Sequence, residues 1–157
     1  MAIVFAVILI WFSIHLYVYI PKKINLLESV FVFMILSIVN NGFCSIITVN
    51  LGWASVYETP TALTVIILQR IIIIPLLFLM VVHVNFMLKS TLAKLFLLLF
   101  SLALIVSMEE LCSYFRVMNY EENRWLIPAL HSSLLYFSGI IGLRLFRPIL
   151  KKGVTMS

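Results

Sequence analysis

The chain has 157 residues, of which 64% are apolar and only 11% are charged. Soluble domains carry about 25% charged and about 45 to 50% apolar residues, so this composition excludes an ordinary soluble protein. The net charge of +5 comes from basic residues at the ends of apolar segments, which does not indicate nucleic-acid binding. We therefore predict a single transmembrane domain over residues 1–157, with the lipid bilayer as its main partner.

Five segments are long and apolar enough for a helix that crosses a bilayer, which takes about 20 residues. We predict an all-α integral membrane bundle of five transmembrane helices, at about residues 2–20, 26–50, 62–88, 91–115 and 125–147. The first segment lacks the positive start and the small-residue cleavage site of a secretory signal. We therefore expect it to remain as an uncleaved helix.

The second segment carries a stripe of small polar residues at spacings of three or four: Ser37, Asn41, Cys44 and Thr48, with Asn40 beside them. Small and hydroxyl residues let helices approach closely and hydrogen-bond to each other. The same stripe is also typical of the wall of a solvated cavity. Both interpretations stay open.

The third segment is almost wholly apolar, yet it contains Gln69 and Arg70 about a third of the way along. By insertion scales, a charge at the bilayer centre costs on the order of 2.5 to 3.5 kcal/mol. We therefore expect a partner for Arg70 on another helix. Pro75 removes one backbone hydrogen bond and should kink this helix, and freed carbonyls often line cavities.

Polar residues of four helices fall at one depth, if each helix rises about 1.5 Å per residue. The fourth segment supplies two glutamates near its end, the fifth a histidine, and the second two asparagines. The predicted intramembrane polar cluster is Asn40, Asn41, Gln69, Arg70, Glu109, Glu110 and His131. We predict that one of the two glutamates pairs with the arginine, and that Gln69 or an asparagine completes its hydrogen bonds.

The distribution of basic residues predicts the orientation. Eight of the 11 lie in three segments that alternate with two poorer loops: Lys22, Lys23, Lys89, Lys94, Arg144, Arg147, Lys151 and Lys152. The poorer loops hold only Arg116 and Arg124. The positive-inside rule then predicts a multi-pass protein of the cell membrane, with its N-terminus outside and its C-terminus cytoplasmic.

Motifs for metal, phosphate or redox chemistry are missing from the sequence. Cys44 and Cys112 lie inside apolar segments and there is no CxxC motif, so we expect two small core residues. There is no Gly-rich phosphate loop, HExxH or GxSxG either. We expect no cofactor, no metal and no catalytic residue. Ser138 and Gly142 form a small-xxx-small pair, which predicts a close-packing face on the last helix.

Glu109 and Glu110 resemble the paired glutamates of the CAAX-protease and bacteriocin-processing family of intramembrane proteases, whose first motif is EExxxR. The resemblance implies an intramembrane hydrolase that uses these glutamates and His131. Tyr114 stands where that motif has arginine, and Ile127 stands where the family's FxxxH motif has phenylalanine. No histidine follows His131, so the family's later histidine motif is missing.

A second resemblance rests on Glu110, Tyr120 and Trp125, the last of which opens the final helix. In these residues the last hairpin is similar to small multi-pass membrane proteins of spore-forming Firmicutes that have no assigned activity. The resemblance implies a fold of similar size and no particular function.

Three functions follow from these observations. We predict a non-enzymatic accessory component that binds a membrane protein or a second copy of itself. The first alternative is a small transporter or sensor with a polar site around Arg70, and the second is the hydrolase. A closed, fully paired network would favour the accessory component. A cavity that reaches Arg70 from outside would favour the transporter or sensor.

Overall fold

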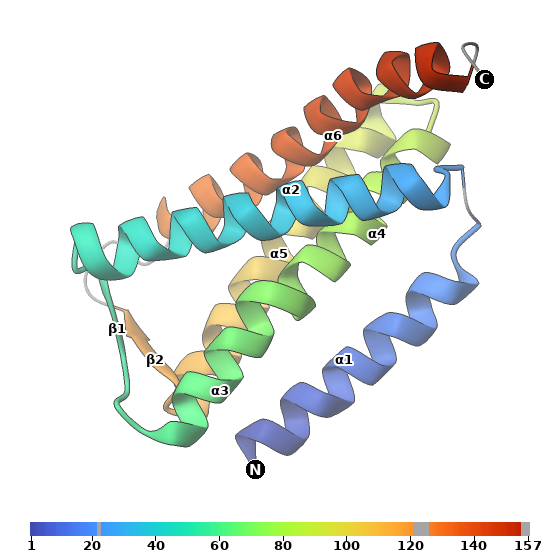
Figure 1. The fold of residues 1–157 in the computed structure, drawn as a ribbon. Helices are drawn as coiled ribbons and strands as arrows, with labels where there is room; N and C mark the ends of the chain where they lie inside the picture. Colours follow the sequence, from blue (N-terminus) through green and yellow to red (C-terminus); the bar gives the residue numbers. More distant parts are fainter. Residues whose placement is uncertain (22, 121–125, 155–157) are drawn as a thin grey trace.

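The computed structural model describes residues 1–21, 23–120 and 126–154, the last four by their backbone alone. Some residues named above fall outside this part of the chain: Lys22, Arg124, Trp125 and, for their side chains, Lys151 and Lys152. The described chain is a bundle of helices with a two-stranded sheet at one end (Figure 1).

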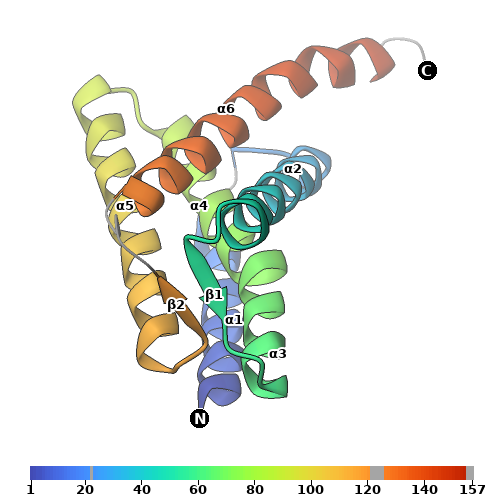
Figure 2. The same cartoon turned by 90° about the vertical axis from the view of Figure 1, so that its left-hand side faces the viewer.

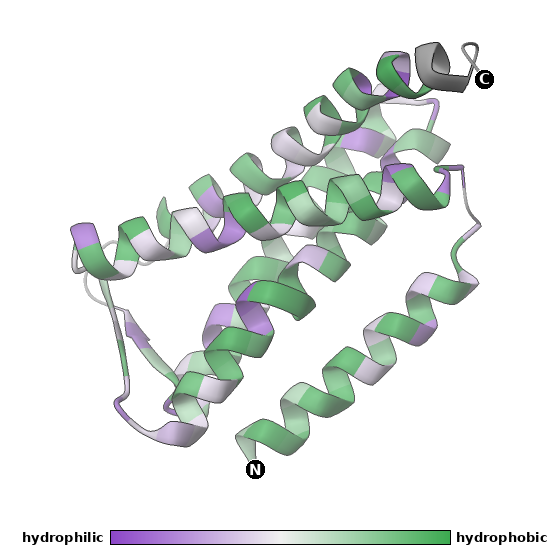
Figure 3. Ribbon diagram, in the orientation of Figure 1, coloured by the Kyte–Doolittle hydropathy of each residue, from purple (hydrophilic) through white to green (hydrophobic). Residues whose placement is uncertain are grey.

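The chain makes five helical passes. They are α1 (Ala2–Tyr19); α2 (Leu26–Ser45), extended by a π-helical turn (Ile46–Asn50); α3 (Pro60–Leu68), a second π-helical turn (Gln69–Ile73) and α4 (Ile74–Met87), which together form the third pass; α5 (Thr91–Tyr114); and α6 (Leu126–Val154). Each pass within the described residues is long and apolar enough to span a membrane, and Figure 3 shows the passes as mainly apolar. The predicted all-α class with five such helices is confirmed.

The pass formed by α3 and α4 departs from regular α-helical hydrogen bonding just before Pro75, the residue at which the sequence predicted a kink. Pro75 has no N–H to donate to the carbonyl of Ile71, four residues earlier. In the preceding π-helical turn, the N–H of Ile74 bonds to the carbonyl of Gln69 and not to that of Arg70. Two successive carbonyls, at residues 70 and 71, therefore lose their usual helical donors.

Side chains of α2 replace those donors. The Asn40 amide donates to the Arg70 carbonyl at 2.6 Å, and the Ser37 hydroxyl lies 3.4 Å from the Ile71 carbonyl. Buried carbonyls without a partner are costly, so these bonds join α2 to the third pass. Two polar residues of the second helix therefore serve helix packing, as one of the two interpretations of that stripe predicted.

The passes α2 and α6 lie side by side along much of their length (Figures 1 and 2). Two glycines of α6 make this approach possible. A Cβ atom at Gly139 would lie 2.7 Å from Val82, and one at Gly142 would lie 2.6 Å from Ile35. Gly142 thus belongs to the close-packing face that the sequence predicted, and Gly139 extends it toward α4.

The sheet joins two loops that are far apart in the sequence. β1 (Ala54–Val56) and β2 (Met118–Tyr120) pair antiparallel, with Ala54 opposite Tyr120. Figure 2 shows both strands at the end of the bundle where α3 begins and α5 ends. The pairing brings β2 over the polar residues of the neighbouring helices.

Candidate functional site

A cavity lies beneath the sheet, among α2, the third pass, α5 and α6. Its polar lining comes from five elements: Cys44, Gln69, Arg70, Glu109, Tyr120 and His131. The volume open to the centres of water molecules is about 30 Å³. Each water requires at least about 10 to 15 Å³ by this measure, so the cavity has room for about two waters.

Five of the seven residues of the predicted cluster meet at this cavity. Four line it, and Asn40 is fully buried against it, bonded to His131 and to the Arg70 backbone. Asn41 and Glu110 do not line it, because both are exposed. Successive residues of a helix point about 100° apart, so only one member of each adjacent pair can face inward.

The Arg70 guanidinium is held at the cavity without the ion pair that the sequence predicted. Its Nη2 atom is buried and has no hydrogen-bond partner among the described residues. The thiol of Cys44 lies within hydrogen-bonding reach of the guanidinium. Within the described chain Glu109 does not pair with Arg70, since its carboxylate lies beside His131, and Glu110 is exposed. The predicted pair is therefore wrong.

His131 is held in one orientation by Asn40. A backbone carbonyl only accepts, so the bond to the Arg70 carbonyl requires the Asn40 amide nitrogen to donate. The Asn40 oxygen then faces Nε2 of His131 at 2.7 Å, and this atom must carry a proton. Phe43 stacks on the imidazole ring with 4.5 Å between centroids. The atom left to gain or lose a proton is Nδ1.

Glu109 lies on the Nδ1 side of His131. Its Oε1 atom is 4.0 Å from Nδ1, and its side chain is 12% exposed. This distance is too long for a hydrogen bond, but it lies within the range of an ion pair if the imidazole becomes charged. The carboxylate, the imidazole and the guanidinium thus face one cavity.

Tyr120 and Cys44 are lining residues that sequence reasoning did not assign to the site. Cys44 belongs to the stripe on α2, so its spacing was a usable signal. Tyr120 reaches the cavity only through the pairing of β2 with β1, which no local pattern predicts. Burial raises the pKa of the Tyr120 phenol, and the Glu109 carboxylate raises it further, so Tyr120 stays protonated and neutral at physiological pH.

Gln69 separates this cavity from a second, apolar one. Its Oε1 atom accepts a hydrogen bond from the Cys112 thiol at 2.8 Å. The apolar cavity lies among α1, the third pass and α5, and Ala2, Ala6 and Cys112 are among its lining residues. Both cysteines are free thiols.

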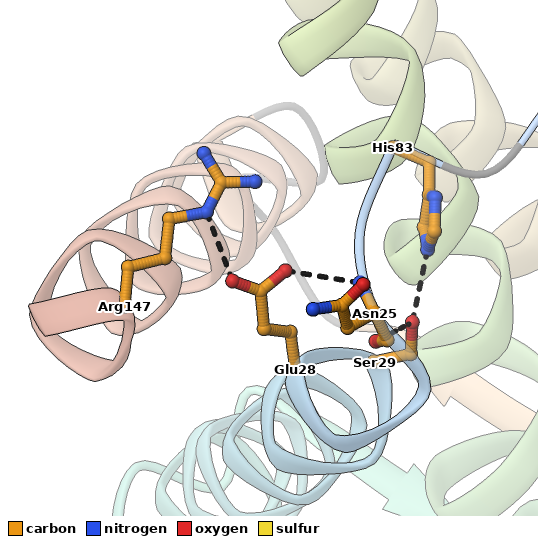
Figure 4. Close-up of polar contacts among 5 residues, drawn as sticks. All are labelled: Asn25, Glu28, Ser29, His83 and Arg147. Carbon is orange, nitrogen blue, oxygen red and sulfur yellow. Dashed lines mark hydrogen bonds and ion pairs between the residues drawn. The ribbon is translucent and has the colours of Figure 1, made fainter. Parts of the chain in front are cut away.

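A second polar cluster lies at the opposite end of the bundle (Figure 4). One Glu28 oxygen accepts from the Asn25 backbone N–H at 3.0 Å and so helps to cap α2, and the other accepts from Arg147 Nε at 3.0 Å. Ser29 donates to the Asn25 carbonyl at 3.0 Å and lies 3.2 Å from Nε2 of His83. The sequence analysis did not predict this pairing of α2 with α6.

The described part of the chain contains no group of three or more His, Cys, Asp or Glu side chains that could hold a metal ion. No protein-family model matches the chain, and neither a curated protein nor a solved structure shows significant similarity to it. Its function therefore has to be argued from its own residues.

Proposed function

We propose that this chain is a multi-pass protein of the cell membrane that binds a small polar ligand in the Arg70 cavity, as a small transporter or a sensor. The N-terminus lies outside and the C-terminus in the cytoplasm, which places the cavity in the outer half of the bilayer. Five apolar passes and the concentration of basic residues at one end support this arrangement.

One observation carries the proposal. The buried Nη2 of Arg70 has no hydrogen-bond partner among the described residues, although it borders a cavity with room for water. Buried charged groups that serve only structure are normally paired. A purely structural network, which an accessory component would need, leaves no reason for an open donor. Polar residues inside a membrane are typical of a ligand or ion site.

The hydrolase alternative receives less support from the same geometry. Its resemblance requires two neighbouring glutamates and a histidine to act together. Glu110 is exposed and does not line the cavity, which leaves Glu109 alone beside His131. The cavity has room for about two waters, which is too small for a peptide substrate.

Water access to the cavity tests the proposal, and Cys44 is a native probe. A variant with Cys112→Ser keeps only this lining thiol. In vesicles of known sidedness, we expect a membrane-impermeant thiol reagent to modify Cys44 from the outer face and not from the inner face. Such reagents act through water, because the reactive form is the thiolate.

The matched control is the Cys44→Ser variant, which keeps only Cys112. That thiol is 6% exposed and bonded to Gln69, so it should react much more slowly. Equal protection of both thiols until the protein is unfolded would show a closed network, and the accessory component would then be the better-supported function.

Reporters fused after Gly153 test the orientation independently. Activity of a reporter that works only outside the cell would contradict a cytoplasmic C-terminus.

A further inference from the structure

The polar groups at the cavity are mostly hydrogen-bond donors. Arg70 offers the buried Nη2. Gln69 uses its oxygen to accept from Cys112, so its amide nitrogen is the end that remains to donate. Tyr120 stays protonated and contributes a phenol. Converging donors around an arginine are suited to an anion, and Glu109 is the one carboxylate among the lining residues that the structure describes.

Among the lining residues that the structure describes, the charges cancel when His131 is neutral. Arg70 contributes one positive charge and Glu109 one negative charge. An added anion would leave an uncompensated negative charge away from water, which is strongly unfavourable. One proton taken up with the anion restores neutrality. The electrostatics of the cavity thus require a proton to accompany each monovalent anion.

The described titratable and charged groups at the cavity come from every element around it: Cys44 of α2, Arg70 of the third pass, Glu109 of α5, Tyr120 of β2 and His131 of α6. Among these side-chain types, imidazole is the one that takes up a proton near neutral pH. Because Nε2 of His131 already holds a proton for Asn40, the new proton enters at Nδ1. That atom faces the Glu109 carboxylate at 4.0 Å.

We propose that the cavity binds one compact monovalent anion together with one proton. The imidazolium formed at His131 pairs with Glu109, so the negative charge of Glu109 is compensated there and the positive charge of Arg70 remains for the anion. A volume that admits about two waters suits an ion of the size of chloride, nitrate or formate. The inference rests on the proposed function and adds to it the class of ligand and the coupled proton.

The test measures anion binding and proton uptake by the full-length protein in lipid nanodiscs. Sodium chloride, nitrate and formate are compared at constant ionic strength, with sodium gluconate as the bulky reference anion.

We expect one of the compact anions to raise the melting temperature. Its apparent Kd should weaken as the pH rises from 7 to 8.5, by at most about tenfold per pH unit, which is the limit for one proton bound with each anion. Titration calorimetry in buffers of different ionisation enthalpy should give the number of protons taken up with each anion. A response to chloride or nitrate would indicate an inorganic ligand, whereas a response confined to formate would indicate a carboxylate ligand.

Variants of the two charged residues distinguish this mechanism from nonspecific salt effects. Arg70→Gln should abolish the response. Glu109→Gln removes the negative charge permanently, so anion binding should persist and lose its pH dependence. Glu110→Gln is the matched control, because it changes the adjacent and exposed carboxylate; it should bind and titrate like the wild type.

Equal responses of wild type and Arg70→Gln, or no response to any compact anion, would overturn the inference. So would an unchanged pH dependence in Glu109→Gln, which is informative even if Arg70→Gln does not fold. Modification of Cys44 from outside without anion binding would leave the proposed function standing and remove only this inference. A Cys44 that stays protected would remove both.

Discussion

The two polar regions of this protein treat buried charge in opposite ways. At one end Glu28 and Arg147 are in direct contact at 3.0 Å, and the carboxylate also helps to cap α2 (Figure 4). At the other end Arg70 and Glu109 border one cavity without pairing, and an arginine nitrogen lacks a partner among the described residues. The first arrangement joins α2 to α6, whereas the second leaves the guanidinium beside the cavity at which we propose that a ligand binds.

The two regions differ in the contacts of their charged groups and not in the presence of charge. A carboxylate that is paired directly and also helps to cap a helix has no oxygen available for another partner. A guanidinium beside a water-sized cavity has a nitrogen available, and the bundle is less stable than it would be with that charge paired. Variants in the paired region should therefore mainly change stability, and variants at the lining of the cavity should mainly change binding.

The largest effect on stability is expected at Asn40, whose side chain bonds to His131 and to the Arg70 carbonyl at the cavity. Asn40→Leu leaves both the Arg70 carbonyl and Nε2 of His131 without their partner. At about 1 to 3 kcal/mol for each buried group, the free energy of unfolding should fall by about 2 to 6 kcal/mol. Reversible unfolding in mixed micelles measures it. Asn41→Leu, at the adjacent exposed position, should change stability little, and equal losses in the two variants would contradict the assigned hydrogen bonds.

Variants of the paired region at Glu28 should lose somewhat less stability. Glu28→Ala removes a helix cap, at about 0.5 to 2 kcal/mol, and a hydrogen bond between charged groups, at about 1.5 to 3 kcal/mol. We expect the free energy of unfolding to fall by about 2 to 5 kcal/mol. In a double-mutant cycle with Arg147→Leu, the combined loss should be smaller than the sum of the single losses. Additive losses would show that the 3.0 Å contact contributes nothing in the membrane.

A smaller effect on stability, with a clear effect on the cavity, is expected for Pro75→Ala. The Ile71 carbonyl, which Pro75 leaves without its helical donor, already has a partner in Ser37 of α2, so the free energy of unfolding should change by less than about 1 kcal/mol. The new N–H competes with Ser37 and should alter the packing of α2, which carries Cys44, against the third pass. We expect the rate of Cys44 modification to change while the melting temperature does not. A large change in stability with an unchanged labelling rate would place Pro75 outside the site.

The smallest effect at neutral pH is expected for Tyr120→Phe. The pKa of Tyr120 is raised in the folded state, whereas an unfolded tyrosine titrates at about 10. The stabilisation by the neutral phenol is thus fully present below about pH 10 and is lost as the pH rises further. Melting temperatures between pH 8 and pH 11 should fall less steeply in Tyr120→Phe than in wild type. The exposed Tyr57 supplies the control, and an identical slope in Tyr57→Phe and Tyr120→Phe would contradict the assignment.

Hydropathy predicted the five passes, and counting residues from the helix ends predicted that Arg70, Glu109 and His131 would lie at one depth. Neither method gives the rotation of a helix about its axis, because this rotation depends on packing against neighbours. For that reason the sequence could not choose Asn40 over Asn41, or Glu109 over Glu110. It also overestimated the pairing of Arg70, since the position of the guanidinium depends on a π-helical turn that no local pattern announced.

The bond between Asn40 and the third pass reaches the backbone of residue 70 and leaves its side chain out. This contact between α2 and the third pass therefore does not depend on which side chain occupies position 70. Lysine, glutamine or a neutral residue there would keep the same carbonyl in the same place. The scaffold and the side chain at residue 70 are thus separate, so that this side chain can be exchanged, by evolution or by design, without first redesigning the contact between the helices.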